Sequence, residues 1–185
     1  MTSHWLFQLA VLAVLVFWML GAYNRLMRLR NAVAAAWEQV LTPLQRRSEA
    51  MAAAVEALRE PFADEAGTLQ ALLDADVRQR QAADAVKSGR CRVGPVAAWV
   101  AAEAGLASPG SRLRALIDLQ QPVLAEVPTA AALQAALASW IELEPRLAFT
   151  RQAFNEAAEQ YNRALHQWPT RLLTPMFGHR DAGRV

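Results

Sequence analysis

The sequence has little of what builds disulfide-bonded, metal-binding or sheet-rich proteins. Its single cysteine, Cys91, can form neither a disulfide framework nor a zinc site, and a lone thiol suits a reducing compartment. Glycine occurs only 8 times and β-branched residues are few, so helix formers dominate over strand formers. The three histidines, His4, His166 and His179, lack the spacing of metal ligands. The composition therefore predicts an all-α protein without a metal site.

The sequence also lacks the short motifs of common enzyme families. It contains no Glu-x-x-His pair of the kind that holds two irons in helical bundles. It contains no His-Glu-x-x-His, no Gly-x-Ser-x-Gly, no Walker loop and no dinucleotide fingerprint. Acidic pairs such as Glu142 and Glu144 are more typical of solvated helix faces than of acid–base sites. We therefore expect no enzymatic activity and no cofactor.

Charge of one sign is not in large excess either. The chain has 19 Lys and Arg residues against 17 Asp and Glu residues, and Lys87 is the single lysine. Domains that bind nucleic acids carry a basic excess, so this balance argues against a nucleic-acid partner.

What the sequence does have is one long uncharged run, WLFQLAVLAVLVFWMLGA, over Trp5–Ala22. About eighteen residues approach the ~20 that cross a ~30 Å hydrocarbon core, and Trp18 stands near one end, where headgroups lie. A cleaved signal peptide is one alternative, but the leader has no Lys or Arg, and Leu20 occupies the −3 position of the best cleavage site. A buried core helix is the other alternative. We predict that residues 5–22 cross a lipid bilayer.

The arginines that follow this run predict its orientation. Arg25, Arg28 and Arg30 come directly after it, and basic flanks stay in the cytoplasm. Residues 1–22 are therefore predicted to be a single-pass anchor in a bacterial inner membrane, with the N-terminus outside and residues 23–185 in the cytoplasm. The three arginines are expected to meet anionic headgroups, at about 1 kcal/mol each.

Residues 23–168 have the pattern of a helical bundle. Apolar residues recur at spacings of three and four, as they do on helices that pack against one another. About four main helices are predicted, the first continuous with the anchor, and they span Tyr23–Arg59, Asp64–Lys87, Ser111–Ala125 and Thr129–Trp168. A turn is expected at Ser108-Pro109-Gly110, after a short apolar helix. Pro43 and Pro145 are expected to bend their helices without ending them.

Short motifs, in order over nearly the whole chain, resemble those of the LemA family. In the first third they are Tyr23-Asn24, Leu29-Arg30-Asn31, Ala36-Trp37, Leu44 and Arg46-Arg47. Further on they are Glu126-Val127-Pro128, Glu144 with Arg146-Leu147-Ala148 and Arg151, Phe154-Asn155, Tyr161-Asn162, Trp168-Pro169, Leu172-Leu173 and Phe177-Gly178. One departure is Ser48-Glu49-Ala50-Met51, where the family has an apolar–proline step.

The resemblance implies a single-pass membrane protein whose long helices form an antiparallel bundle. It implies no established enzymatic activity, and it leaves the biochemical role open. The residues of these motifs are the candidate structural or binding residues of the chain.

Two pairs of asparagines within these motifs lead to a more specific hypothesis. Asn24 and Asn31 are seven residues apart, as are Asn155 and Asn162, so each pair lies on one helix face. Asparagine is a mediocre helix former, so both pairs call for an explanation. The structural interpretation is a hydrogen-bonded seam between helices, and the functional one is a polar ligand surface near the membrane. Trp37 is expected in the core.

An antiparallel return of the last helix predicts that Tyr161-Asn162 lies level with Tyr23-Asn24, next to the bilayer. The tail, residues 169–185, would then arrive at the headgroups with several apolar side chains and arginines. That composition suits an interfacial segment, and a tail folded onto the end of the bundle is the equal alternative.

Together these observations favour a structural or interaction protein. The first hypothesis is a rigid scaffold or adaptor that is tethered to the membrane and presents a long surface to an unidentified protein partner. The alternative is a lipid-interacting module that senses or organises the bilayer. A membrane-bound enzyme is the weakest hypothesis, because no catalytic constellation is present.

Overall fold

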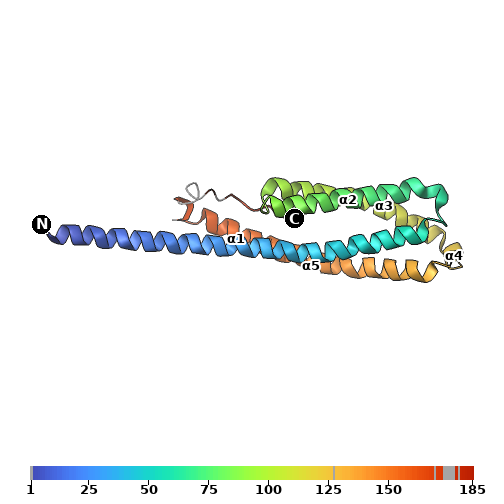
Figure 1. Ribbon diagram of the computed structural model, residues 1–185, viewed down its shortest axis with the longest axis horizontal. Coiled ribbons are helices and arrows are strands. Elements are labelled where there is room, and N and C mark those ends of the chain that lie inside the picture. The colour runs from blue at the N-terminus through green and yellow to red at the C-terminus, as the bar shows by residue number, and fades with distance from the viewer. Residues whose placement is uncertain (1, 127, 169, 173–177, 179) are drawn as a thin grey trace.

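The computed structural model describes all residues except 1, 127, 169, 173–177 and 179. Most of the chain lies in four long helices (Figure 1). In chain order the elements are α1 (Thr2–Leu58), the 3₁₀ turn η1 (Ala63–Glu65), α2 (Ala66–Ser88), α3 (Val93–Leu119), the one-turn α4 (Gln121–Leu124), α5 (Ala130–His166) and the 3₁₀ turn η2 (Thr170–Leu172). The described residues include no β-strand, only an isolated bridge between Arg92 and Ala182. The all-α prediction is confirmed.

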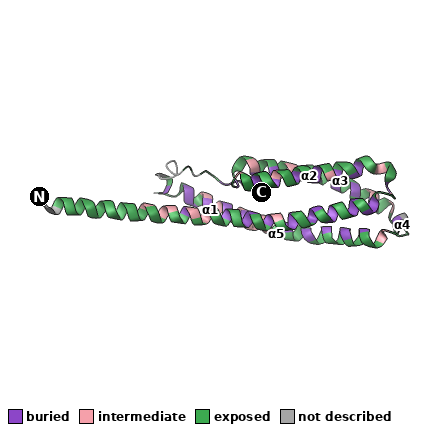
Figure 2. Cartoon of the chain, viewed as in Figure 1, coloured by how far each residue is buried: buried purple, intermediate pink, exposed green. Residues whose placement is uncertain are grey.

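Helix α1 has two parts with different surroundings. The first part carries the uncharged run and projects beyond the bundle with its side chains exposed (Figures 1 and 2). It contains a window that is long and apolar enough to cross a membrane, and none of that window is buried. From Leu26 onward, α1 buries an apolar residue every three or four positions and forms one wall of the bundle. The predicted continuity of the two parts is confirmed.

The bundle consists of two antiparallel helix pairs. α1 packs along α5, α2 packs along α3, and α1 also contacts α2. The α2–α3 pair is the shorter one, so α1 and α5 extend past the α2–α3 turn (Figure 1). We call the end where the uncharged run leaves the bundle the proximal end and the opposite end the distal end.

The core has two halves along the length of the bundle. The proximal core is rich in aromatic residues, and its largest members are Trp37, Leu44, Trp99, Leu147, Phe154 and Tyr161. The distal core is mainly aliphatic, and its members include Met51, Leu58, Leu72, Leu106, Leu113 and Trp140. Burying an aliphatic side chain contributes roughly 1.5–3 kcal/mol, so both halves contribute substantially to stability.

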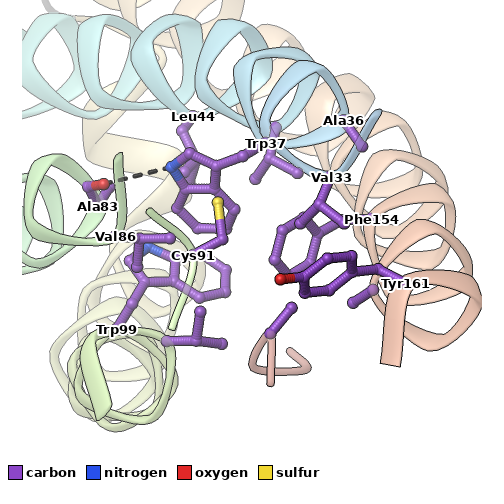
Figure 3. Close-up of a cluster of buried hydrophobic side chains, with 14 of the residues drawn as sticks. Val33, Ala36, Trp37, Leu44, Ala83, Val86, Cys91, Trp99, Phe154 and Tyr161 are labelled. Carbon is purple, nitrogen blue, oxygen red and sulfur yellow. Dashed lines mark hydrogen bonds between the residues drawn. The ribbon is translucent and has the colours of Figure 1, made fainter. Parts of the chain in front are cut away.

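Trp37 of α1 lies at the centre of the proximal core (Figure 3). Its side chain is 1% exposed, and its ring packs edge-on against Trp99 at 5.2 Å and against Phe154 at 5.1 Å between centroids. Its indole N–H donates a hydrogen bond of 3.3 Å to the carbonyl oxygen of Ala83 in α2. One side chain thus joins all four long helices, and the prediction of a core tryptophan is confirmed.

Three prolines lie inside helices rather than at their ends. Pro43 and Pro145 interrupt neither α1 nor α5, as predicted. The predicted turn at Ser108-Pro109-Gly110 is wrong, because α3 continues through it. Leu106 and Leu113 are buried on either side of Pro109 in the same face, so the seam with the rest of the bundle outweighs the local cost of the proline.

The ends of two helices differ from the prediction. The helix predicted to reach Ala125 ends at Leu119, which is 79% exposed. The last helix was predicted to reach Trp168, yet α5 ends at His166 and Trp168 is 80% exposed. In both cases the apolar pattern runs past the point where the helix has a partner to pack against.

Candidate functional site

A pocket of about 390 Å³ opens near the proximal end, where the α2–α3 turn faces α1 and the C-terminal segment. We call it the proximal pocket. Its α1 wall lies between Met27 and Glu38, and Tyr161 of α5 stands beside that wall. The basic residues that line it are Arg30, Lys87, Arg90, Arg92 and Arg180. They come from α1, the end of α2, the α2–α3 turn and the C-terminal segment, so only the folded chain brings them together.

The proximal pocket carries an excess of positive charge. Glu38 is its single acidic residue, so five basic side chains against one carboxylate leave a formal charge of +4. Lys87 Nζ lies 2.8 Å from Glu38 Oε1, and this hydrogen bond with its charge raises the pKa of Lys87. The four arginines of the pocket form no ion pair with any residue that the structure describes. No carboxylate of the described chain therefore lies within ion-pair distance of these four guanidinium groups.

The α2–α3 turn places two of these arginines. Arg90 and Cys91 both have left-handed backbones, with φ of 56° and 55°, and such residues cost of order 1–3 kcal/mol each. The Cys91 N–H donates to the carbonyl oxygen of Val86 at 2.9 Å, which ties the turn to α2. Burial raises the pKa of the Cys91 thiol to about 11, so this cysteine stays a protonated core residue. Arg90 and Arg92 flank it on the exposed side.

Two asparagines of α5 form hydrogen bonds to the C-terminal segment, whose residues Arg180 and Ala182 line the proximal pocket. Asn162 Nδ2 donates to the main-chain oxygen of Ala182 at 2.9 Å, and the N–H of Ala182 donates to Asn162 Oδ1 at 2.8 Å. Asn155 makes the same pair of bonds with Val185, at 2.6 and 2.8 Å. We call these four bonds the asparagine clamp.

The spacing of the asparagine clamp follows from elementary geometry. Seven helical residues at 1.5 Å each separate the two asparagines by about 10.5 Å. Three extended residues at about 3.3 Å each separate Ala182 from Val185 by about 10 Å. The two spacings therefore match, and each asparagine amide pairs with both the N–H and the C=O group of one residue of the segment.

The other edge of the C-terminal segment is held by the α2–α3 turn. The N–H of Gly183 donates to the carbonyl oxygen of Cys91 at 2.9 Å, next to the bridge between Arg92 and Ala182. A Cβ atom at Gly183 would stand 2.5 Å from Cβ of Val96, so only glycine fits this approach. The segment thus joins α5 of one helix pair to the turn of the other.

A buried ion network lies between the two halves of the core. The two terminal nitrogens of the Arg47 guanidinium, Nη1 and Nη2, donate to the Glu103 carboxylate at 2.7 Å, and Arg151 Nη2 lies 2.6 Å from the same carboxylate. Burial disfavours the charged form of Glu103, but the hydrogen bonds and charges of Arg47 and Arg151 outweigh it and lower its pKa. Arg151 also stacks over Trp99, 4.9 Å from the ring centroid. The network fixes how α1, α3 and α5 meet.

The arrangement of Arg47, Arg151, Asn155 and Asn162 gives a structural reason for motifs that the sequence spreads over more than a hundred residues. A comparison with protein-family models finds that the LemA family model matches residues 36–184. The chain belongs to the LemA family. A comparison with curated proteins finds no match.

Several of the LemA motif residues meet through partners that the motifs do not contain. Glu144 lies 3.9 Å from Arg47 and accepts a 3.1 Å hydrogen bond from the Trp140 indole. The central partner, Glu103, was not among the predicted residues. The sequence did contain an indication of its role. Glu103 is a polar residue at a core-facing position of α3, four residues after Trp99 and three before Leu106.

The register of the two ends of the LemA bundle differs from the prediction. Gln167 accepts a 3.4 Å hydrogen bond from Arg25, and Tyr161 shares the proximal pocket with Arg30 and Asn31. Tyr161-Asn162 therefore lies about 10 Å, or about seven residues of helix, further from the uncharged run than the predicted level of Tyr23-Asn24. The antiparallel direction is as predicted, and its register is wrong by about two turns.

The remaining motif residues are more scattered. Asn24 and Arg46 are exposed, as is Arg28, which was predicted at the membrane interface. Asn31 lines the proximal pocket, and its side chain makes no hydrogen bond to another helix among the described residues. Gly178 also lines the pocket, with a left-handed φ of 62°. Pro169 and Phe177 lie outside the described residues, as does most of the apolar part of the tail. Within the described part of the chain, no group of three or more His, Cys, Asp or Glu side chains could hold a metal ion.

Proposed function

We propose that this LemA family protein is a membrane-anchored scaffold that holds a helical surface at a fixed distance from the inner membrane. One observation carries the proposal: the uncharged run and a full wall of the bundle belong to the same helix, α1. A flexible linker would let the bundle reorient relative to the anchor, whereas an unbroken helix fixes the position of the bundle relative to the anchor.

The length of α1 supports a stalk-like role. From Tyr23 to Leu58 the helix extends about 54 Å at 1.5 Å per residue, which is longer than the bilayer core is thick. The distal end of the bundle would thus stand about 50 Å from the membrane. No catalytic role enters this proposal.

The outer face of α5 is the best candidate for the partner surface. Ile141 is 66% exposed and Phe149 is 72% exposed, two large apolar side chains eight residues apart. Pro145, also exposed, stands between them. Exposed apolar side chains that form a patch mark interaction sites more often than single ones do.

In-cell photocrosslinking tests the scaffold. A photoreactive residue is placed at Phe149 and, as a matched control, at Gln160, which is eleven residues further on a similar face of α5. We expect Phe149 to capture one defined protein and Gln160 to capture none. Equal capture at both positions, or only lipid at both, would contradict the proposal.

The proposed orientation is also testable. The three arginines after the uncharged run support a cytoplasmic location for residues 23–185. A reporter fused after Val185 that fluoresces only in the cytoplasm should be bright, and a reporter that works only in the periplasm should be inactive. The reverse result would place the bundle outside the cell membrane.

A lipid-interacting module is the second candidate, and a specific observation favours it. The proximal pocket gathers four arginines without ion-pair partners among the described residues, on the part of the bundle closest to the anchor. Such a surface attracts anionic headgroups at about 1 kcal/mol per basic residue.

A further inference from the structure

We propose that the proximal pocket is a binding site for a phosphate group. The ligand is either the phosphodiester of an anionic lipid or a soluble phosphorylated compound, since both present the same chemistry to arginine. The lipid form rests on the proposed membrane anchor and names the ligand class of the second candidate function. The soluble form does not depend on it.

The residue type of the pocket is the first argument. A guanidinium group has five donors in a planar fork that matches the oxygens of phosphate, and it keeps its charge at any physiological pH. Arg30, Arg90, Arg92 and Arg180 line one pocket of about 390 Å³, large enough for such a group. Lysine is different: the single lysine of the chain, Lys87, is already paired with Glu38.

The way these side chains are held is the second argument. Four arginines lining one pocket repel one another, and the pocket contains one carboxylate, which serves Lys87. The chain nevertheless brings Arg180 to the pocket through the asparagine clamp, and it places Arg90 through a left-handed backbone. Arg92 is the residue that precedes the first turn of α3, and that turn contains no acidic residue. The dipole of α3 therefore adds positive potential instead of being neutralised.

The position of the pocket is the third argument. Arg30 lies eight residues beyond Ala22, or about 12 Å along α1. The headgroup layer occupies about 5–7 Å on each side of the hydrocarbon core, and charges act over about 8 Å at physiological ionic strength. The pocket thus lies within electrostatic reach of the lipid phosphates, while it also stays open to soluble compounds.

The test uses the full chain in lipid nanodiscs, because α1 forms both the anchor and a wall of the pocket. One arm adds pyrophosphate to protein in pure phosphatidylcholine discs and measures binding by calorimetry. The other arm includes phosphatidylglycerol in the discs and measures, by native mass spectrometry, how much of this lipid stays on the protein after release from the disc.

The pocket variant combines Arg90→Asn with Arg92→Gln. Asparagine tolerates the left-handed backbone of position 90, and both arginines are exposed without ion pairs in the described chain, so the fold should be preserved. The matched control, Arg46→Gln with Arg78→Gln, removes the same charge from exposed positions of α1 and α2 outside the pocket.

We expect the pocket variant to bind its probe at least about tenfold more weakly than wild type, and the control to bind within about twofold. A lipid ligand is indicated if phosphatidylglycerol is retained and pyrophosphate does not displace it. A soluble ligand is indicated if pyrophosphate binds in pure phosphatidylcholine discs and displaces the lipid. The proposal is overturned if neither probe binds, or if both variants lose the same affinity. Flotation with membranes and crosslinking at Phe149 report the anchor and the scaffold separately.

Discussion

The proximal and distal halves of the bundle reach similar burial by different means. The proximal half closes around Trp37, Trp99 and Phe154 and needs the C-terminal segment to complete it. The distal half packs aliphatic side chains from all four long helices, and no described residue of the tail is among its members. The proximal half is therefore assembled from more distant parts of the chain, and it also holds the pocket arginines, which form no ion pair among the described residues. Assembly from distant parts gives a site that exists only when the fold is complete.

The largest expected effect is that of removing the aromatic centre. Trp37→Ala should destabilise the bundle by about 3–5 kcal/mol, because it leaves a cavity that touches four helices. Cys91, the single thiol, is buried in the same half and reports its opening. Thiol labelling of Cys91 should accelerate in Trp37→Ala and remain slow in Leu113→Ala, a change of comparable kind in the distal half. Equal acceleration would mean that the two halves open as one unit.

The second effect concerns the network that separates the halves. Glu103→Ala leaves the Arg47 guanidinium buried with only Glu144 at 3.9 Å, and it should cost about 3 kcal/mol in chemical denaturation. The folded-state pKa of Glu103 is lowered, so its stabilising contribution is present above the ordinary carboxyl value of about 4.3 and is lost as pH falls through the lower folded value.

Glu103→Gln should therefore flatten the acid side of the stability profile. If wild type and Glu103→Gln lose stability in parallel below about pH 4, other carboxylates control acid unfolding.

The third effect is confined to the asparagine clamp. Asn155→Ala or Asn162→Ala removes two hydrogen bonds to main-chain groups, and each should cost about 1–2 kcal/mol. Amide hydrogen exchange should rise at Ala182 and Gly183 in both variants while the distal core stays protected. Asn24→Ala, at an exposed position of α1, is the control and should change nothing in that segment.

The smallest effect is expected on the outer surface of α5. Arg146 pairs with Glu142 four residues before it, both largely exposed. Arg146→Ala should cost only about 0.3 kcal/mol, since such pairs are weak in water. A loss above about 1 kcal/mol in thermal unfolding would show that this face contributes more than its exposure implies.

Periodicity predicted much of the fold from the sequence, because helices repeat locally. The spacing of apolar residues placed Trp37 in the core and carried α1 through Pro43. The same local reasoning failed at Pro109, where packing of Leu106 and Leu113 across the bundle decides the outcome. It also failed for the register of Tyr161. The register depends on where α5 stops packing against α1, and the local spacing of apolar residues does not contain that information.

The candidate site was harder to predict than the fold. The asparagines at 155 and 162 were recognised as exceptional, but their partner is an extended segment with no periodic signal of its own. The pocket arginines at 90 and 180 come from a turn and a tail, two regions where sequence spacing says nothing about proximity. Predicting Glu103 as the centre of the ion network would have required knowledge of which positions of α3 face the core.

Because α1 is unbroken, the rotational orientation of the bundle about the helix axis is fixed relative to the uncharged run. Each residue added between Ala22 and Leu26 would rotate the whole bundle by about 100° about the helix axis and lift it by 1.5 Å. A single inserted alanine would thus turn the proximal pocket away from whatever it faces, while seven would restore the direction to within about 20° and raise the pocket by about 10.5 Å. Insertions of different length thus change the rotation and the height of the bundle separately. Any activity that requires the bundle to face a partner should rise and fall with the number of inserted residues, with the period of the α-helix.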